Sequence, residues 1–312
     1  MSKVTLEIFA VEVKKHIKEI LGDGYNTEIR TVSKNNGIIL TGISISRIGD
    51  SVSPLFYLND SYTQMEDIKT DAEDVARKIV NCFRGHGNLP AATHLSVNVL
   101  HDFEQVKGKV MFKLINTRSN ECLLRQVPNM PYLDLSIVFY LYMGEDEEGM
   151  MTAQLNNEHF ALWEVDVQTL YRNALQNMQR VMAAVIKSMK EIMNSLRMVC
   201  EEESNEDERE EATPFHVLTT ASGINGAVCM LYPGVLAGFA EQRGKDIIII
   251  PSSVHELLLM EDVEGMDYKE LVDLVRLINA TEVAHEDVLS GNIYRYERYC
   301  GKVSMINIDE IL

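Results

Sequence analysis

Two runs of large apolar residues, separated by a proline and two serines, constrain the fold of this chain more than any other stretch. The sequence IIIIPSSVHELLLM occupies residues 247–260. Pro251 lacks the backbone N–H that a continuing strand needs, and Ser252 and Ser253 can bond nearby backbone groups and fix a turn. The stretch therefore predicts two buried strands joined by a sharp turn.

The same turn holds residue types that carry out hydrolysis in other proteins. Ser253 and His255 stand two positions apart and would share one face of an extended chain, with Ser252 and Glu256 beside them. No known motif is complete, however. The zinc motif H-E-x-x-H has Leu259 where its second histidine belongs, and the glycines of the nucleophile elbow G-x-S-x-G are missing. We assign no catalytic residue and keep both interpretations, a structural turn and a polar site.

Apolar periodicity and turn residues predict further elements near the N-terminus. Residues 4–21 place apolar side chains at steps of three and four, the spacing of one helical face. Asn36-Gly37 lies between two apolar stretches and predicts a tight hairpin, because both residue types readily adopt positive φ angles. Thr63 and Glu66 match a capping box and predict that a helix begins at Thr63.

The predicted elements favour an α+β fold with mixed or antiparallel sheets and packed helices, because strands joined by tight turns cluster toward both ends of the chain. Beyond residues 247–260, strands are predicted at 27–33, 37–46, 53–58, 109–116, 133–143, 150–155, 214–220, 292–299 and 302–308. Beyond residues 4–21 and the helix after Thr63, helices are predicted from the mid-90s to 103 and at 119–126, 159–165, 167–178, 178–200 and 267–280. Residues 226–244 predict a short strand or turn that runs into a further helix, with Pro233 in its first turn.

A methionine-rich stretch and an acidic run suggest how the chain is divided. Residues 178–200 keep one apolar helical stripe throughout and predict a rod of about 34 Å. The sequence EEESNEDEREE follows, with eight acids and one arginine. We expect two lobes, an N-terminal α+β lobe of residues 1–177 and a C-terminal α+β lobe of residues 213–312. A long helix and acidic linker, residues 178–212, would join them.

The charge of the chain favours one kind of partner. The formal net charge is −18, of which the acidic run contributes −7, so the remainder still carries −11. Such a chain repels nucleic-acid phosphate, and no basic stripe offsets the repulsion. We therefore expect no direct nucleic-acid binding, and a basic protein surface is the partner that the charge favours.

Other sequence features favour a cytoplasmic protein without a metal or cofactor. No apolar run approaches the roughly 20 residues of a membrane-spanning helix, and the first residues lack the apolar core of a signal peptide. The cysteines are odd in number and widely spaced, which indicates reduced thiols. They are Cys82, Cys122, Cys200, Cys229 and Cys300. His86, His94 and His101 lack ligands at metal-binding spacing.

Several phrases, taken in order, resemble a domain-of-unknown-function family, number 5688, from gut Firmicutes. The phrases are SPLFYLNDSY, KVMFKLIN, VPNMPYLDLSIVFY, LYRNALQN, HVLTT, GAVCMLYPGVL, IIIIPSSVHELLLM and NIYRYER, of which LYPG and PSS-x-HE are the most specific. The resemblance implies a cytoplasmic bacterial protein of an accessory or mobile-element system and no particular reaction. The residues that it marks are Asp134, Tyr232, Pro233, Ser252, Ser253, His255 and Glu256.

Together these observations favour a non-enzymatic binding or interaction protein. Its candidate ligand-binding residues are Asp134, Tyr232, Ser252 and His255. The alternative is a hydrolase or transferase in which Ser252 or Ser253 is the nucleophile and His255 the base. In that enzyme, Glu256 or Asp134 would orient the histidine and Tyr232 would line the pocket.

Overall fold

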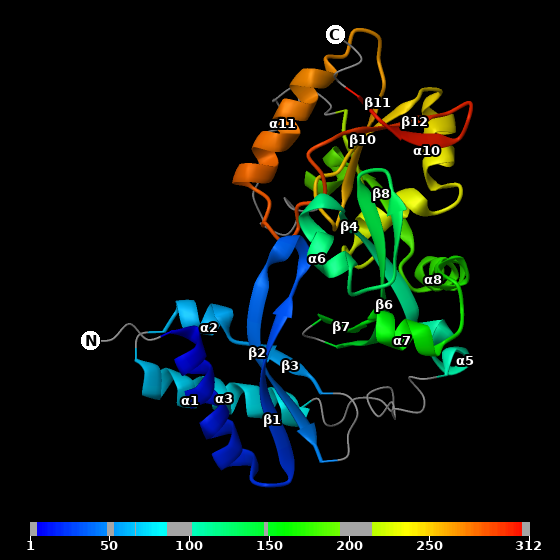
Figure 1. Ribbon diagram of the computed structural model, residues 1–312. Coiled ribbons are helices and arrows are strands. Elements are labelled where there is room, and N and C mark those ends of the chain that lie inside the picture. The colour runs from blue at the N-terminus through cyan, green and yellow to red at the C-terminus, as the bar shows by residue number, and fades with distance from the viewer. Residues whose placement is uncertain are drawn as a thin grey trace.

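The chain folds into helices and antiparallel sheets, which confirms the α+β class (Figure 1). The computed structural model describes residues 5–48, 53–65, 67–85, 102–146, 149–193 and 214–307. Within these ranges, no helix combines the length and the apolar character that crossing a bilayer requires. The described strands form three separate sheets, each with its own helices.

The first sheet packs against the N-terminal helices. It has the strand order β1-β2-β3, and both strand pairs are antiparallel. Its elements are α1 (Leu6–Leu21), β1 (Tyr25–Ser33), η1 (Asn35–Gly37), β2 (Ile39–Arg47), β3 (Leu55–Tyr57), α2 (Asn59–Thr63) and α3 (Ile68–Gly85). The apolar face of α1 is buried against β2 and α3, and Phe9, Val13 and Ile43 are fully enclosed there.

Of two predictions for the N-terminal sheet and its helices, the hairpin is confirmed and the capping box is wrong. The predicted hairpin is confirmed, since Asn36 and Gly37 have φ angles of 55° and 75°. The capping box is wrong, because Thr63 ends α2 and its hydroxyl donates to the carbonyl oxygen of Asp60 at 2.7 Å. A carboxylate caps α3 instead, since Asp67 Oδ1 accepts the backbone N–H groups of residues 69 and 70.

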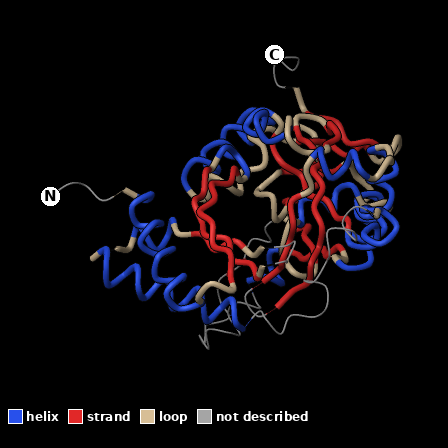
Figure 2. The backbone as a smooth tube through the Cα atoms, turned by 60° about the horizontal axis from the view of Figure 1, so that its bottom comes forward, coloured by secondary structure: helices blue, strands red, loops and turns tan. Residues whose placement is uncertain are grey.

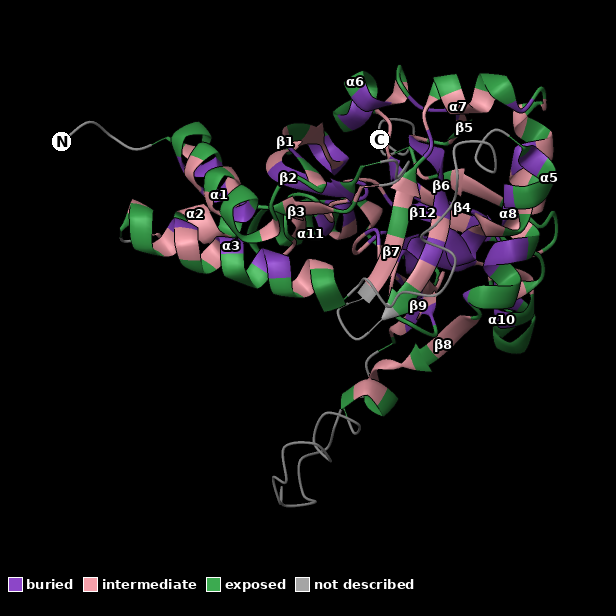
Figure 3. Ribbon diagram, turned by 90° about the horizontal axis from the view of Figure 1, so that it is seen from below, coloured by how far each residue is buried: buried purple, intermediate pink, exposed green. Residues whose placement is uncertain are grey.

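The second sheet is built around the long strand β6, with β4 on one side and β5 and β7 on the other. Its elements are α5 (Phe103–Val106), η4 (Lys107–Lys109), β4 (Val110–Asn116), η5 (Arg118–Asn120), α6 (Glu121–Leu124), β5 (Asn129–Tyr132), β6 (Leu135–Asp146), β7 (Gly149–Gln154), α7 (Asn157–Leu162) and α8 (Val167–Val181). Figure 3 shows buried positions gathered where β4, β6 and β9 lie, which is the main core.

The third sheet has six antiparallel strands in the order β13-β12-β10-β11-β9-β8. Its elements are β8 (Ala184–Ser188), β9 (His216–Thr220), η6 (Gly226–Leu231), α10 (Val235–Arg243), β10 (Ile247–Ile250), β11 (Leu257–Glu261), α11 (Tyr268–Thr281), β12 (Tyr294–Glu297) and β13 (Lys302–Met305). Ile248 and Ile250 face α11, whereas Ile247 and Ile249 face the main core. Figure 2 shows strands in the interior of the larger part of the molecule and helices along much of its outside.

The predicted long helix of residues 178–200 is wrong. Helix α8 ends at Val181, and residues 184–188 form β8, an edge strand that pairs with β9. Pairing with β9 satisfies the backbone of a β-branched segment, so the sheet overrides its helical spacing. Residues 189–193 are helical again. The acidic run and the helix predicted in the mid-90s lie outside the described residues, and the division into lobes stays a prediction.

One loop holds the parts of the molecule together, and we call residues 285–294 the anchor segment. The tip of the β1–β2 hairpin docks on it (Figure 1). Asn36 Nδ2 donates to the carbonyl oxygens of His285 and Val288, both at 2.7 Å. Asn120 adds a bond, because its Oδ1 accepts the backbone N–H of Asn36 at 2.8 Å. The anchor segment therefore fixes the N-terminal unit against the remaining sheets.

Candidate functional site

The turn between β10 and β11 is the first candidate site. The two strands are antiparallel and buried, as predicted, and residues 251–256 connect them. The Ser252 hydroxyl donates to Glu256 Oε1 at 3.3 Å, and Ser253 Oγ accepts the backbone N–H of His255 at 3.0 Å. Both hydroxyls and the Glu256 carboxylate are thus engaged within the turn itself.

The His255 ring is held from both sides by residues outside the turn. Its Nδ1 accepts the backbone N–H of Asn225 at 3.2 Å, and its Nε2 lies 3.2 Å from Asp287 Oδ1. Because a backbone N–H only donates, Nδ1 carries no proton, and the Nε2–H donates to the carboxylate. The ring side chain is 38% exposed. Neither nitrogen is left to accept a proton from a serine.

Helix η6 lies directly against the turn and explains a glycine. A Cβ at Gly226 would lie 2.2 Å from the carbonyl oxygen of His255 and 2.6 Å from Thr219 Cα. The Thr219 hydroxyl donates to the same carbonyl oxygen at 2.8 Å. Asn225 precedes the helix in the left-handed region with a φ of 51°. This close approach places the Asn225 N–H against the imidazole.

Asp134 is the second candidate, and it also binds the anchor segment. Its carboxylate accepts the Ser290 hydroxyl at 2.6 Å, the Asn292 amide at 3.0 Å and the Tyr294 hydroxyl at 2.7 Å. Burial, with the adjacent Asp134 charge as the next cause, raises the pKa of Tyr294 far above its usual value. All three donors are neutral, so the carboxylate links the second sheet to the anchor segment without an ion pair.

Tyr232 and Pro233 lie at the entry to α10. The Tyr232 hydroxyl donates to the carbonyl oxygen of Met182 at 3.0 Å, and burial raises its pKa far above the usual value. Gly234 is the N-cap, with a φ of 83°, so Pro233 precedes the helix. This places Tyr232 as a structural contact between α10 and the end of α8.

Two of the predicted residues, Asp134 and His255, each bind the anchor segment. Both therefore fix that segment to another part of the fold. Sequence reasoning missed their partners Asp287, Ser290 and Asn292, which follow the turn by more than 30 positions. Side chains of these types are common in loops, and no motif links them to His255 or Asp134. The pairing is a product of the tertiary fold.

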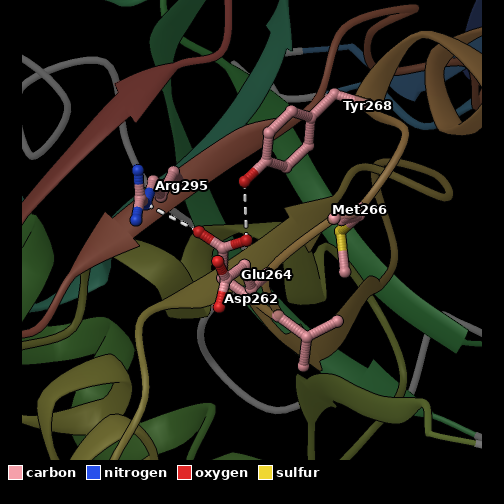
Figure 4. Close-up of a pocket in the computed structure, with 7 residues that line it drawn as sticks. Asp262, Glu264, Met266, Tyr268 and Arg295 are labelled. Carbon is pink, nitrogen blue, oxygen red and sulfur yellow. Dashed lines mark hydrogen bonds and ion pairs between the residues drawn. The ribbon is translucent and has the colours of Figure 1, made fainter.

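A polar hollow of about 220 Å³ lies where β11 leads into α11 (Figure 4). Arg295 bridges two carboxylates there. Its guanidinium lies 2.9 Å from Asp246 and 2.9 Å from Asp262, the latter as an ion pair without hydrogen-bond alignment. The Tyr268 hydroxyl donates to Asp262 at 2.6 Å, and burial followed by this bond raises the pKa of Tyr268 to about 12. The Asp262, Tyr268 and Arg295 side chains that line the hollow are therefore paired with one another, and they fix the start of α11.

Few residues in the described ranges are suited to bind a metal ion or to act as a reactive thiol. No group of three or more His, Cys, Asp or Glu side chains could hold a metal ion there. Cys229 is fully buried, and burial raises the pKa of its thiol to about 12, so the reactive thiolate is suppressed. The predicted non-ligands His86, His94 and His101 lie outside the described residues.

Comparison with known proteins gives a lineage and no reaction. No curated protein and no solved structure matches the chain significantly. A family model matches residues 6–298, nearly the whole chain, and it is described as a family of unknown function, DUF5688. The resemblance of the sequence phrases is thereby confirmed, and the chain belongs to the DUF5688 family.

Proposed function

We propose that this chain is a non-enzymatic binding protein of an accessory bacterial system, and that its partner is a cytoplasmic protein with a basic surface. One observation carries the proposal: three exposed apolar side chains form a stripe on the outer face of α11, within an acidic segment of the chain. The hydrogen bonds of the 251–256 turn add support, because they engage Ser252, Ser253 and His255 within the fold.

The outer face of α11 carries exposed apolar side chains. Its inner face buries Val272 and Val275 against the third sheet. On the opposite side Leu274, Leu277 and Ile278 are 46%, 59% and 39% exposed. These positions follow an i, i+3, i+4 spacing and adjoin one another on the helix surface. Figure 1 places α11 on the outside of the sheet, where a partner can reach it.

The sequence segment that contains the stripe is acidic, which favours a basic partner. Residues 264–287 hold seven carboxylates against two cationic side chains, a local net charge of −5. Asp273 and Glu270 lie on α11 itself and are exposed. A basic amphipathic segment would cover the leucines and meet these acids at the rim, a common mode of helix recognition.

The surface is fixed before a partner arrives. Asp267 caps α11, since its Oδ1 accepts the backbone N–H groups of Lys269 and Glu270 at 3.0 Å. The preceding loop is held by Asp262, which Tyr268 and Arg295 both contact. A rigid surface loses little conformational entropy on binding.

The test is the affinity of the partner purified from the native host. Leu277→Glu should weaken binding by at least about tenfold, because it places a charge in the apolar stripe. Leu162→Glu on α7 is the matched control, since Leu162 is 52% exposed and remote in sequence. Affinity should also fall as salt is raised. A partner that binds Leu277→Glu normally, or binds independently of salt, would refute the proposal.

The hydrolase or transferase alternative needs a serine hydroxyl against His255. The Ser252 hydroxyl instead contacts Glu256, and Ser253 Oγ contacts the His255 backbone. No distance in the described turn favours this alternative over the binding proposal.

A further inference from the structure

A second hollow lies between the start of α10 and the β12–β13 hairpin. Its volume is about 430 Å³, within the size range of small-molecule sites. Its lining is largely apolar and aromatic, with Met230, Leu231, Leu236, Tyr132 and Tyr296 among its residues. It differs from the outer face of α11 in position and chemistry, and none of its residues belongs to the turn at 251–256.

The charge of this hollow is opposite to that of the chain. No Asp or Glu is among its lining residues, and Lys302 is the charged side chain there. The Lys302 ammonium makes no ion pair and no hydrogen bond with the described part of the chain, whereas the Lys302 backbone pairs with Glu297 on β12. In a protein of net charge −18, a hollow lined by an unpaired ammonium and no carboxylate favours an anion.

The first turn of α10 adds free donors to the same hollow. Gly234 is the N-cap and has no side chain to accept from the helix. The N–H of Val235 bonds the Tyr232 carbonyl, and that of Gly238 bonds the Gly234 carbonyl. Between them, the N–H groups of Leu236 and Ala237 have no acceptor among the described residues. Such groups at a helix N-terminus bind anions.

Tyr296 provides an independent sign that a ligand binds here. It is only 7% exposed, it lines the hollow, and its hydroxyl has no hydrogen-bond partner in the described structure. The hydroxyl lies beside Gly301, another lining residue, since a Cβ built there would be 3.7 Å away. The buried hydroxyls of Tyr232 and Tyr294 are both bonded. The Tyr296 hydroxyl therefore faces the hollow and is free to donate a hydrogen bond to a ligand there.

We infer that this hollow binds a small organic anion, in which a carboxylate or phosphate group is attached to an apolar body. The anionic group would accept the N–H groups of Leu236 and Ala237 and the hydroxyl of Tyr296, with the Lys302 ammonium beside it. The apolar body would pack against the Met230 and Leu231 side of the lining.

Calorimetric titration with four probes tests the class of ligand. Phenyl phosphate and benzoate combine an anion with an apolar ring, whereas benzamide lacks the charge and inorganic phosphate lacks the ring. At least one of the first two should bind saturably and tighter than either control, and the better of them identifies the anionic group. The inference is overturned if neither binds, if benzamide binds as tightly as benzoate, or if inorganic phosphate binds as tightly as phenyl phosphate.

Two variants locate the binding. Tyr296→Phe should weaken the better probe about tenfold, the value of a hydrogen bond to a charged group, while leaving the stability of the fold unchanged. Lys302→Gln should weaken it about two- to fivefold, as expected for an exposed charge. Tyr268→Phe and Lys269→Gln, outside the hollow, are the matched controls and should bind normally. Unchanged affinity in both pocket variants would overturn the inference.

Discussion

The turn at residues 251–256 and the hollow beside α10 both present polar groups next to the main core, and they differ in whether those groups are paired. In the turn, Ser252, Ser253 and both nitrogens of His255 have partners within the protein. In the hollow, the Tyr296 hydroxyl has none among the described residues. Polar groups that the fold has already satisfied serve the fold, and unsatisfied ones are available to a ligand.

The largest expected change in stability concerns Gly226, which packs closely against the 251–256 turn. Gly226→Ala should lower the free energy of unfolding by about 3 kcal/mol, because its methyl group would overlap the His255 carbonyl and the Thr219 backbone. Gly238→Ala is the matched control within α10. Nothing lies within 4 Å of its Cβ, and it should stabilise by about 0.5 kcal/mol. Denaturant titration measures the free energy of unfolding of both variants. Equal changes in the two variants would show that Gly226 is not required for the close packing of the turn.

Substitution of Asp134, which the sequence predicted to bind a ligand, tests whether its carboxylate stabilises the fold instead. Asp134→Ala should lower the free energy of unfolding by about 2 kcal/mol, because it strands the donors of Ser290, Asn292 and Tyr294. Asp273→Ala, on the exposed side of α11, should change it by less than about 0.5 kcal/mol. If Asp134→Ala folds as stably as the parent protein, the anchor interpretation is wrong.

Tyr232 and Tyr296 allow a direct comparison between a hydroxyl with a partner in the fold and one without. Tyr232→Phe should lower the free energy of unfolding by about 1 kcal/mol, since it removes the bond to the Met182 carbonyl. Tyr296→Phe removes a hydroxyl without a partner and should leave the free energy unchanged or slightly raised. Thermal unfolding of the two variants decides the point. A larger loss at Tyr296 would show that its hydroxyl serves the fold.

The smallest effect concerns pH. Burial, with the neighbouring Arg243 as the next cause, lowers the pKa of His216 below 6.5. Between the lowered value and 6.5, the unfolded chain binds more protons than the folded protein. The contribution of His216 is therefore complete above pH 6.5 and declines as the pH falls. His216→Gln should remove this part of the pH dependence of unfolding, and an identical profile in the variant would contradict the assignment.

Local signals in the sequence predicted much of the fold. Asn36-Gly37 predicted the hairpin, Pro251 predicted the turn between buried strands, and the apolar pattern of residues 267–280 predicted α11. Each depends on residues within a few positions. The helix predicted at 178–200 failed because β8 exists only through its pairing with β9.

The candidate site was predicted less well, for the same physical reason. His255 was singled out from its neighbours in sequence, but Asn225 and Asp287, which decide its role, are 30 and 32 positions away. Tyr296 has no distinctive sequence context, and its importance rests on the absence of a partner. That property belongs to packing, which local spacing does not determine.

The tautomer of His255 decides between the structural and the catalytic interpretation of the 251–256 turn, because the structural interpretation requires both ring nitrogens to be engaged by the fold. Proton–nitrogen correlation spectra report the tautomer at alkaline pH, where histidine is neutral. We expect a protonated Nε2 and an unprotonated Nδ1. A general base that accepts a serine proton through Nε2 needs the reverse arrangement. A protonated Nδ1 with a free Nε2 would therefore contradict a structural role for His255.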